Sequence, residues 1–204
     1  EQPTVPQVRL GEWISEGWDM FAKQWQTWVL IILTFVLVQI VAMVPGGILV
    51  GVLDAGRDPG DGASPIGLII SLLANVLNLV LGSFLMAGGF RTAFKQLRGG
   101  QISVGDLFSG GDVFLWLIPA QLLIPLIAGI GLFLCVVPGL IAYGLLFFTI
   151  PLIVVGGVNA FEAMRRSFET TKQNLLMFTL FPIVVWLIAI SGALGCGVGL
   201  LATV

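Results

Sequence analysis

The sequence predicts an all-α fold, a polytopic transmembrane helical bundle of about six spans, arranged as three hairpins with amphipathic interfacial helices. Hydrophobic residues make up 57% of the 204-residue chain and charged residues only 10%, whereas a soluble domain carries about 25% charged residues. Long apolar stretches recur along the chain, and basic residues gather in alternate connections between them. These three observations indicate one integral membrane domain over residues 1–204.

Six apolar stretches account for the expected spans. An amphipathic helix at about residues 11–27 precedes them, and the three hairpins cover about residues 28–89, 103–157 and 159–204. The sixth stretch begins near Gly195 and stops at Val204, which is too short to cross a bilayer core that needs about 20 helical residues. Either the chain continues beyond Val204, which we favour, or this segment only dips into the membrane. The stretches lie at about residues 28–44, 66–89, 113–134, 139–157, 175–191 and 195–204.

The basic residues indicate the side of the membrane on which each connection lies. With six spans, eight of the nine basic residues fall on one side, and Arg57 is the exception. Because cytoplasmic loops carry an excess of Lys and Arg, we expect a cytoplasmic amino terminus. The eight residues are Arg9, Lys23, Arg91, Lys95, Arg98, Arg165, Arg166 and Lys172.

The segment from Glu12 to Gln26 predicts a helix that lies in the membrane interface. Its polar residues form one stripe at helical spacing, and its Ile and aromatic residues form another. Tryptophan prefers the headgroup level of a bilayer, so the Trp residues indicate an interfacial anchor. A helix packed on the protein's own bundle is the alternative. The expected anchors are Trp13, Trp18, Trp25 and Trp28.

Two further segments carry capping signals. Asn159 is a candidate cap for an amphipathic helix over residues 159–173, and Glu162 and Arg166 form an i, i+4 pair on its polar face. Ser103 and Asp106 are candidates to cap a turn that precedes the third span.

These segments predict an internal repeat of an amphipathic helix, an apolar helix, a Gly- or Pro-marked break and a returning helix. Aligning Lys23-Gln24 with Lys172-Gln173 places a break at Pro45-Gly46-Gly47 opposite Leu194-Gly195-Cys196. Pro138-Gly139 marks the turn of the middle unit.

The composition argues against catalysis, metal binding and nucleic-acid binding. The chain has no His, so the commonest general base and metal ligand is absent. No phosphate-binding glycine motif is present, and a net charge of −2 gives no basis for binding nucleic acid. We therefore expect no enzyme activity, no cofactor and no metal. Cys135 and Cys196 could form a disulfide at the outer ends of their hairpins, but two buried thiols are the interpretation we favour.

The spans hold amides but no ionisable side chain. Intramembrane charges are typical of pumps and proton relays, so their absence disfavours such carriers. Asn75 and Asn78 share one helix face and could line a polar path or bind a headgroup; the more common role is a hydrogen bond to a neighbouring helix. Small-residue pairs that allow close helix approach occur at Gly47/Gly51 and Gly195/Gly199. The four amides are Gln39, Asn75, Asn78 and Gln121, and the spans are interrupted by Pro119, Pro125, Pro151 and Pro182.

Four stretches carry a resemblance to a known family: GGFRTAFKQLRG at 88–99, SVGDLFSG at 103–110, VPGL at 137–140 and GCGVGLLAT at 195–203. In this order they resemble a bacterial family of uncharacterised six-span integral membrane proteins. The chain is also similar to the membrane domain attached to some glycerophosphodiester phosphodiesterases. The resemblance covers about residues 11–204 and implies a bacterial inner (cytoplasmic) membrane protein. It implies no catalytic residues, because the phosphodiesterase chemistry belongs to a separate soluble domain that residues 1–204 do not contain.

Two functions from different classes follow from these expectations. The first is a non-catalytic accessory or scaffold subunit of a larger membrane complex, with the lipid bilayer and other membrane subunits as partners. The second is a carrier or binder of a lipid or a small apolar solute. An enzyme is the third class, and it would have to use the cytoplasmic cluster of Arg91, Lys95, Arg98, Asp106 and Asp112, a pattern typical of a solvated positive-inside anchor.

Overall fold

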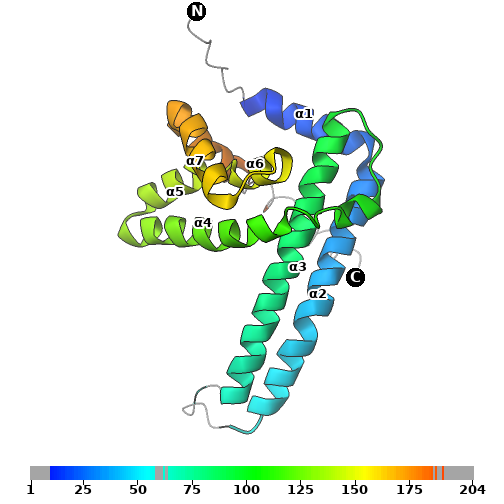
Figure 1. Ribbon diagram of the computed structural model, residues 1–204, viewed down its shortest axis with the longest axis vertical. Coiled ribbons are helices and arrows are strands. Elements are labelled where there is room, and N and C mark those ends of the chain that lie inside the picture. The colour runs from blue at the N-terminus through cyan, green and yellow to red at the C-terminus, as the bar shows by residue number, and fades with distance from the viewer. Residues whose placement is uncertain (1–9, 58–61, 63, 186, 188–189, 191–204) are drawn as a thin grey trace, which may run out of the picture. The chain divides into compact units, whose positions relative to one another are not determined.

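The computed structural model describes residues 10–57, 62, 64–185, 187 and 190, and no strand occurs among them (Figure 1). Four segments are long and apolar enough to cross a membrane: α2 (Trp25–Asp54), α3 (Pro65–Leu97), α4 (Phe114–Leu134) and residues Val136–Gly156. The prediction of an all-helical membrane protein is confirmed at this level. The sixth expected span lies outside the described residues, and 175–185 of the fifth are helical.

The other elements are short. They are α1 (Leu10–Lys23), the 3₁₀ turns η1 (Val104–Phe108) and η2 (Lys172–Asn174), α5 (Val136–Leu145), α6 (Thr149–Gly156) and α7 (Ala160–Thr171). The described chain forms two compact units. The amino-terminal unit contains residues 17–119 and 154–157, and the carboxyl-terminal unit contains the described residues of 1–16, 120–153 and 158–204.

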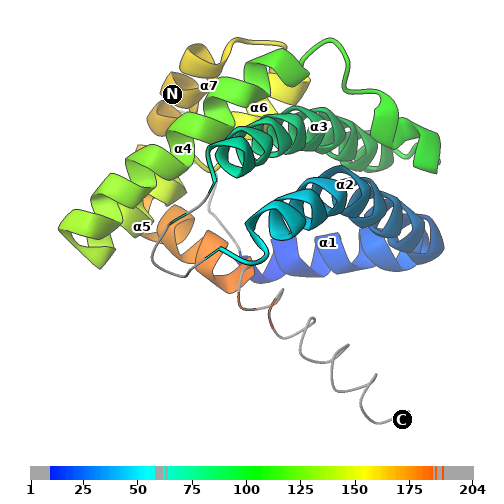
Figure 2. The same ribbon diagram turned by 90° about the horizontal axis from the view of Figure 1, so that it is seen from below.

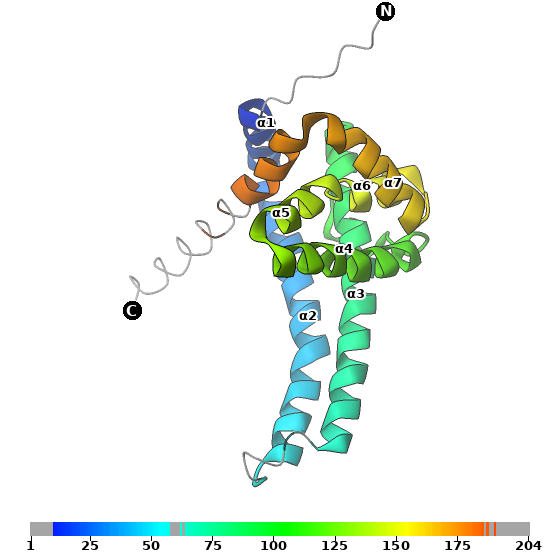
Figure 3. The same cartoon turned by 90° about the vertical axis from the view of Figure 1, so that its left-hand side faces the viewer.

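The antiparallel pair α2 and α3 forms the frame of the amino-terminal unit (Figures 1, 2 and 3). At 1.5 Å per residue these helices are about 45 and 50 Å long, so both exceed a hydrocarbon core of about 30 Å. Ser64 caps α3 by accepting a hydrogen bond of 3.0 Å from the N–H of Gly67, and Pro65 begins the helix. A small core joins the two helices to the loop after α3, through Ile31, Leu85, Ile102 and Leu107.

The predicted break at Pro45-Gly46-Gly47 is wrong, because α2 continues through it to Asp54. Proline removes one backbone donor, and in an apolar surrounding no water competes for the remaining backbone groups. The helix ends where the chain turns at Gly56, whose φ of +89° is readily adopted only by glycine. At its start α2 includes Trp25, so the amphipathic helix ends at Lys23 rather than near residue 27.

The loop after α3 packs closely on that helix. Its capped turn is confirmed: the Asp106 carboxylate accepts a hydrogen bond of 2.8 Å from the N–H of Ser103, and η1 follows. Leu107 of this turn is buried. A side chain at Gly88 would overlap the carbonyl of Leu107, so glycine permits this contact.

In the carboxyl-terminal unit the chain reverses at Cys135, which has an extended backbone and ends α4. The expected turn at Pro138-Gly139 is wrong by about one helical turn, since both residues already belong to α5. The turn is tight because a Cβ atom on Gly131 would lie 2.8 Å from the Cα of Gly139. Cys135 is exposed rather than buried, and Cys196 lies outside the described residues.

The fourth expected span is two helices, because α5 ends at Leu145 and α6 begins at Thr149. Pro151 lies in the first turn of α6, where its missing N–H is not needed. The hydroxyl of Ser167 donates to the carbonyl of Leu145 at 2.7 Å and accepts from the N–H of Phe148 at 3.2 Å. The Thr171 hydroxyl lies 3.0 Å from the same carbonyl. Side chains of α7 therefore satisfy the backbone groups that the break releases. The continuous α4 shows that Pro119 and Pro125 do not break their helix.

The amphipathic helix α7 is formed as predicted. Asn159 accepts a hydrogen bond of 2.9 Å from the N–H of Glu162, and Glu162 pairs with Arg166 at 2.8 Å. Its buried face consists of the small residues Ala160, Ala163, Ser167 and Thr171. Lys23-Gln24 and Lys172-Gln173, which the repeat aligns, both lie where an amphipathic helix ends and the next helix follows.

Replacing Ser167 by Ala tests the role of α7 at the break. We expect a loss of about 1–3 kcal/mol of unfolding free energy, because the Phe148 N–H is left without its acceptor. Denaturant unfolding in detergent micelles measures it. Thr170→Ala is the matched control, since that exposed hydroxyl bonds only to Arg166 of its own helix, and we expect a change below about 0.5 kcal/mol. Equal losses in both variants would contradict the assignment.

Candidate functional site

Three of the predicted intramembrane amides lie between α2 and α3. The amide nitrogen of Gln39 lies 3.5 Å from the carbonyl oxygen of Asn78, which is a long hydrogen bond across the two helices. Asn75 and Asn78 line a cavity of about 220 Å³ together with Ser71 of α3. The opposite wall comes from α2, where Gly46 and Gly47 leave the space open.

This cavity offers hydrogen bonds rather than catalysis. Gln39 does not line the cavity but contacts Asn78, which does. The Gln39 carbonyl oxygen is buried and has no hydrogen-bond partner among the described residues, and such a group costs about 1–3 kcal/mol when it stays unpaired. Asn75 uses its amide on the carbonyl of Ser71, 2.7 Å away in its own helix. Amides neither gain nor lose protons near neutral pH, so the site can hold a water or a hydroxyl but provides no acid or base.

Gln121, the fourth predicted amide, is half-buried in α4 and belongs to the carboxyl-terminal unit, whereas the other three belong to the amino-terminal unit. The structure therefore assembles three of the four amides.

The four predicted Trp anchors have different surroundings. Trp18 and Trp25 are 68% and 53% exposed, which fits rings that meet lipid headgroups. Trp13 packs its ring on Phe178 and Phe181, with centroids 6.3 and 5.7 Å apart. Trp28 is half-buried and donates its indole N–H to another side chain.

The partner of Trp28 is Gln96, which the sequence did not single out. The Gln96 carbonyl oxygen accepts from the Trp28 indole at 2.7 Å, and its amide donates to the carbonyl of Met20 at 2.6 Å. Gln24 accepts from the N–H of Ile102 at 3.1 Å. Two glutamines thus join α1, α2, α3 and the following loop within the amino-terminal unit. The available signal was that Thr92 and Gln96 are polar at i, i+4 spacing on a face that lacks the charges of α3.

The cationic end of α3 is paired with the loop that follows it. Arg91 donates to Asp112 at 2.6 Å, and Lys95 donates to both carboxylate oxygens of Asp106 at 2.9 and 2.8 Å. The hydrogen bond from Lys95 holds the pKa of Asp106 below its ordinary value of 3.8. Likewise the hydrogen bond from Arg91 lowers the pKa of Asp112. Arg91 with Asp112 and Lys95 with Asp106 neutralise one another in pairs, which is a structural role, whereas Arg98 forms no such pair in the described chain.

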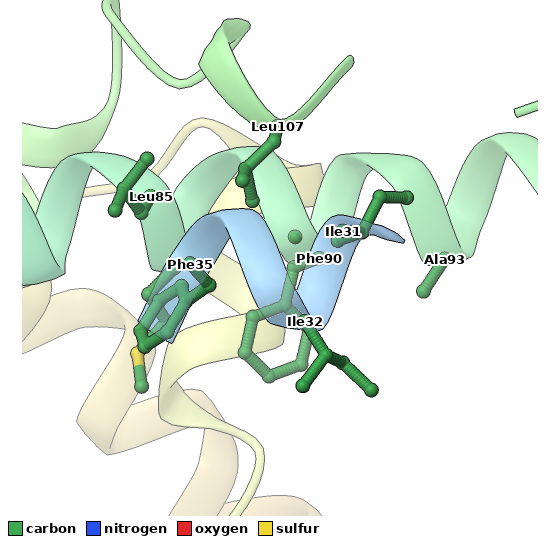
Figure 4. Close-up of a pocket in the computed structure, with 9 residues that line it drawn as sticks. Ile31, Ile32, Phe35, Leu85, Phe90, Ala93 and Leu107 are labelled. Carbon is green, nitrogen blue, oxygen red and sulfur yellow. The ribbon is translucent and has the colours of Figure 1, made fainter. Parts of the chain in front are cut away.

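A second cavity, of about 310 Å³ and wholly apolar, lies between the beginning of α2 and the end of α3. Figure 4 shows Ile31, Ile32 and Phe35 of α2 facing Leu85, Phe90 and Ala93 of α3, with Leu107 of η1 completing the wall. No polar side chain lines it. Among the described residues, no group of three or more His, Cys, Asp or Glu side chains is arranged to hold a metal ion.

Comparison with known proteins gives one match. A family model described as "Domain of unknown function (DUF7847)" matches residues 103–204, which include η1 and α4 to α7. No curated protein and no solved structure matches the chain.

The hydrogen bond between Ser103 and Asp106 should report the ionisation of the cluster. Because the pKa of Asp106 is lowered in the folded protein, its carboxylate stabilises the turn above pH 3.8, and this stabilisation is lost as the pH falls through the lowered pKa. The amide chemical shift of Ser103, followed by NMR in detergent during an acid titration, should show a midpoint below 3.8. In Lys95→Met the midpoint should move upward. An unmoved midpoint would mean that Lys95 does not stabilise the carboxylate.

Proposed function

Because this chain belongs to the family of the Domain of unknown function (DUF7847), whose name carries no activity, we propose a function from the geometry. The protein is a non-catalytic multi-pass membrane protein that serves as an accessory or scaffold subunit of a larger membrane complex. Its partners are the lipid bilayer and other membrane subunits.

The observation that carries this proposal is an open glycine face on α2. Gly46 packs on α3, since a Cβ atom there would lie 3.1 Å from the Cβ of Ala74. A Cβ atom on Gly47 or Gly51 would meet nothing within 4 Å in the described part of the chain. Small residues four apart let two helices approach closely. Gly46 therefore serves the internal pair. Gly47 borders the amide cavity at its exposed edge, and both Gly47 and Gly51 are exposed and leave room for a further helix.

The surroundings of this face favour another helix over chemistry. Ile31 is the one buried residue of α2 among those described, and large apolar side chains such as Met43 and Ile48 flank the glycines. In a bilayer such a surface contacts either lipid or another transmembrane helix, and close packing at small residues drives helix association there.

The proposed topology has six spans in three hairpins within a bacterial inner membrane, with a cytoplasmic amino terminus. Asp54 and Arg91 support it, because Asp54, the last residue of α2, lies beside the start of α3, and Arg91 lies near the other end of α3. Ser64, which caps that helix, donates its N–H to Asp54, and Arg91 lies about 39 Å farther along the helix axis than Pro65. This separation exceeds the thickness of a hydrocarbon core of about 30 Å. The amphipathic helices α1 and α7 would then lie at the cytoplasmic surface.

The double variant Gly47→Leu, Gly51→Leu tests the scaffold proposal. We expect the wild-type chain to bring down stoichiometric membrane subunits from a mild detergent extract. The variant should recover about tenfold less of them, the effect of losing roughly 1.4 kcal/mol of packing, with its own fold intact. Quantitative mass spectrometry of the purified complexes measures this.

Two control variants accompany this test. Val52→Leu changes an exposed residue of α2 and should retain the subunits, whereas Gly46→Leu should destabilise the chain itself. A wild-type chain that purifies alone would sink the proposal.

The apolar cavity favours a second candidate function, a carrier or binder of a lipid or small apolar solute. Its volume of about 310 Å³ reaches the lower end of the range of ligand pockets, about 300–1,000 Å³. With only apolar side chains in its wall, it would hold an acyl chain or an apolar ring.

Filling this cavity tests the second candidate. Ala93→Trp should remove one lipid adduct per chain in native mass spectrometry, because the indole would occupy the space between α2 and α3. Leu72→Trp, at an exposed position of the same helix, should keep the adduct. If Ala93→Trp retains the same number of adducts as the wild type, the cavity is not a lipid site.

A further inference from the structure

We propose that the cytoplasmic end of α3 holds a binding site for a phosphate monoanion, the phosphodiester of an anionic phospholipid headgroup. The site goes beyond the proposed scaffold function, and it uses neither the open glycine face of α2 nor the apolar cavity. It rests on a cavity of about 380 Å³ in the amino-terminal unit. Arg91, Lys95 and Arg98 all line that cavity.

Helical spacing brings the three cations together. They are at i, i+4 and i+7, with Arg98 as the residue that caps the carboxyl end of α3, which places them on one side of its last turns. The remaining wall is apolar and includes Phe94 of the same helix together with Val154 and Val155. A cavity with cations on one side and apolar side chains on the other suits an amphiphile better than a freely soluble ion.

The charges of the site do not cancel. Asp112 accepts from Arg91, and Asp106 accepts from Lys95. The side chain of Arg98 has no acidic partner among the described residues. Three cations and two carboxylates leave one positive charge, which matches the single negative charge of a phosphodiester.

Arg91 and Lys95 can still donate hydrogen bonds to a phosphate although each is paired with an aspartate. A guanidinium carries five N–H donors and an ammonium carries three. Arg91 uses two of its nitrogens, on Ser109 and Asp112. The aspartates thereby fix where the charged ends of Arg91 and Lys95 lie, while Arg98 supplies the uncompensated charge.

The depth of the site selects a lipid as the source of the phosphate. Basic pockets on the cytoplasmic side of membrane helices bind anionic headgroups. Here the cations follow directly after the apolar part of α3. A lipid whose headgroup lies at their level would therefore place its acyl chains beside Phe94 and the exposed side chain of Val155.

Lipid competition with the intact chain tests the proposal. The protein is placed in nanodiscs that contain phosphatidylglycerol and phosphatidylcholine, and the retained lipids are counted by native mass spectrometry. We expect a preference for phosphatidylglycerol that falls about fivefold in Arg98→Ala, the effect of one cation near a membrane surface. Because the Arg98 side chain is exposed, the variant should fold.

The matched control is Arg57→Ala, which removes the same charge at the opposite end of the α2–α3 pair and should retain the preference. Equal losses in the two variants, or no preference in the wild type, would overturn the site. A further measurement with inorganic phosphate distinguishes a lipid headgroup from a free phosphate as the anion that the site binds. Release of the lipid by millimolar phosphate would assign the site to a free anion and overturn the lipid assignment, whereas an unchanged lipid count supports it.

Discussion

Backbone N–H and C=O groups in a bilayer have no water to bond with, and this constraint governs where the chain departs from a helix. Where α5 ends, the carbonyl of Leu145 and the N–H of Phe148 lose their helical partners, and Ser167 of α7 bonds to both. Each departure from helix within the apolar stretches thus needs a nearby partner inside the protein. Small residues on α7 bring its hydroxyls close enough to serve.

The same constraint explains how the amino-terminal unit is joined. Its long helices have apolar surfaces that give little reason to prefer one neighbour over another in lipid. Directional contacts supply the preference. Gln96 bonds to Trp28 and to the backbone of Met20, and the missing side chain of Gly88 lets the carbonyl of Leu107 approach α3.

The sequence predicts the features that depend on composition and local spacing. The apolar stretches, the caps at Asn159 and Ser103, and the pair of Glu162 with Arg166 all depend on residues within four positions of one another. The positions at which helices break were harder to predict from the sequence. Pro45 lies inside α2 because one missing donor does not end a helix in an apolar environment. Pro138 lies in the first turn of α5, where its missing N–H is not needed, and Cys135 carried no signal for the turn that it makes.

The amide site between α2 and α3 also combines features that local spacing predicts with contacts that it does not predict. Spacing along α3 was enough to pair Asn75 with Asn78 on one face, but it could not identify the contact with Gln39, 39 positions away. Gln96 was missed for a related reason, since its two partners are 68 and 76 positions away. Contacts at such separations depend on how α2 packs on α3, and apolar helices align with one another in many registers.

A single helix forms a wall of all three cavities, and the chemistry of each follows its depth. With Arg91 at the membrane surface, Asn75 lies about 24 Å farther into the bilayer, where an ionised side chain is costly but an amide is tolerated. The apolar cavity at Leu85 and Ala93 comes next, and the cations occupy the end, where water and headgroups solvate them. A helix longer than the hydrocarbon core can carry these three environments in order. The glycine face of α2 and the cationic end of α3 therefore involve different surfaces, so the proposed helix partner and the proposed headgroup would not compete.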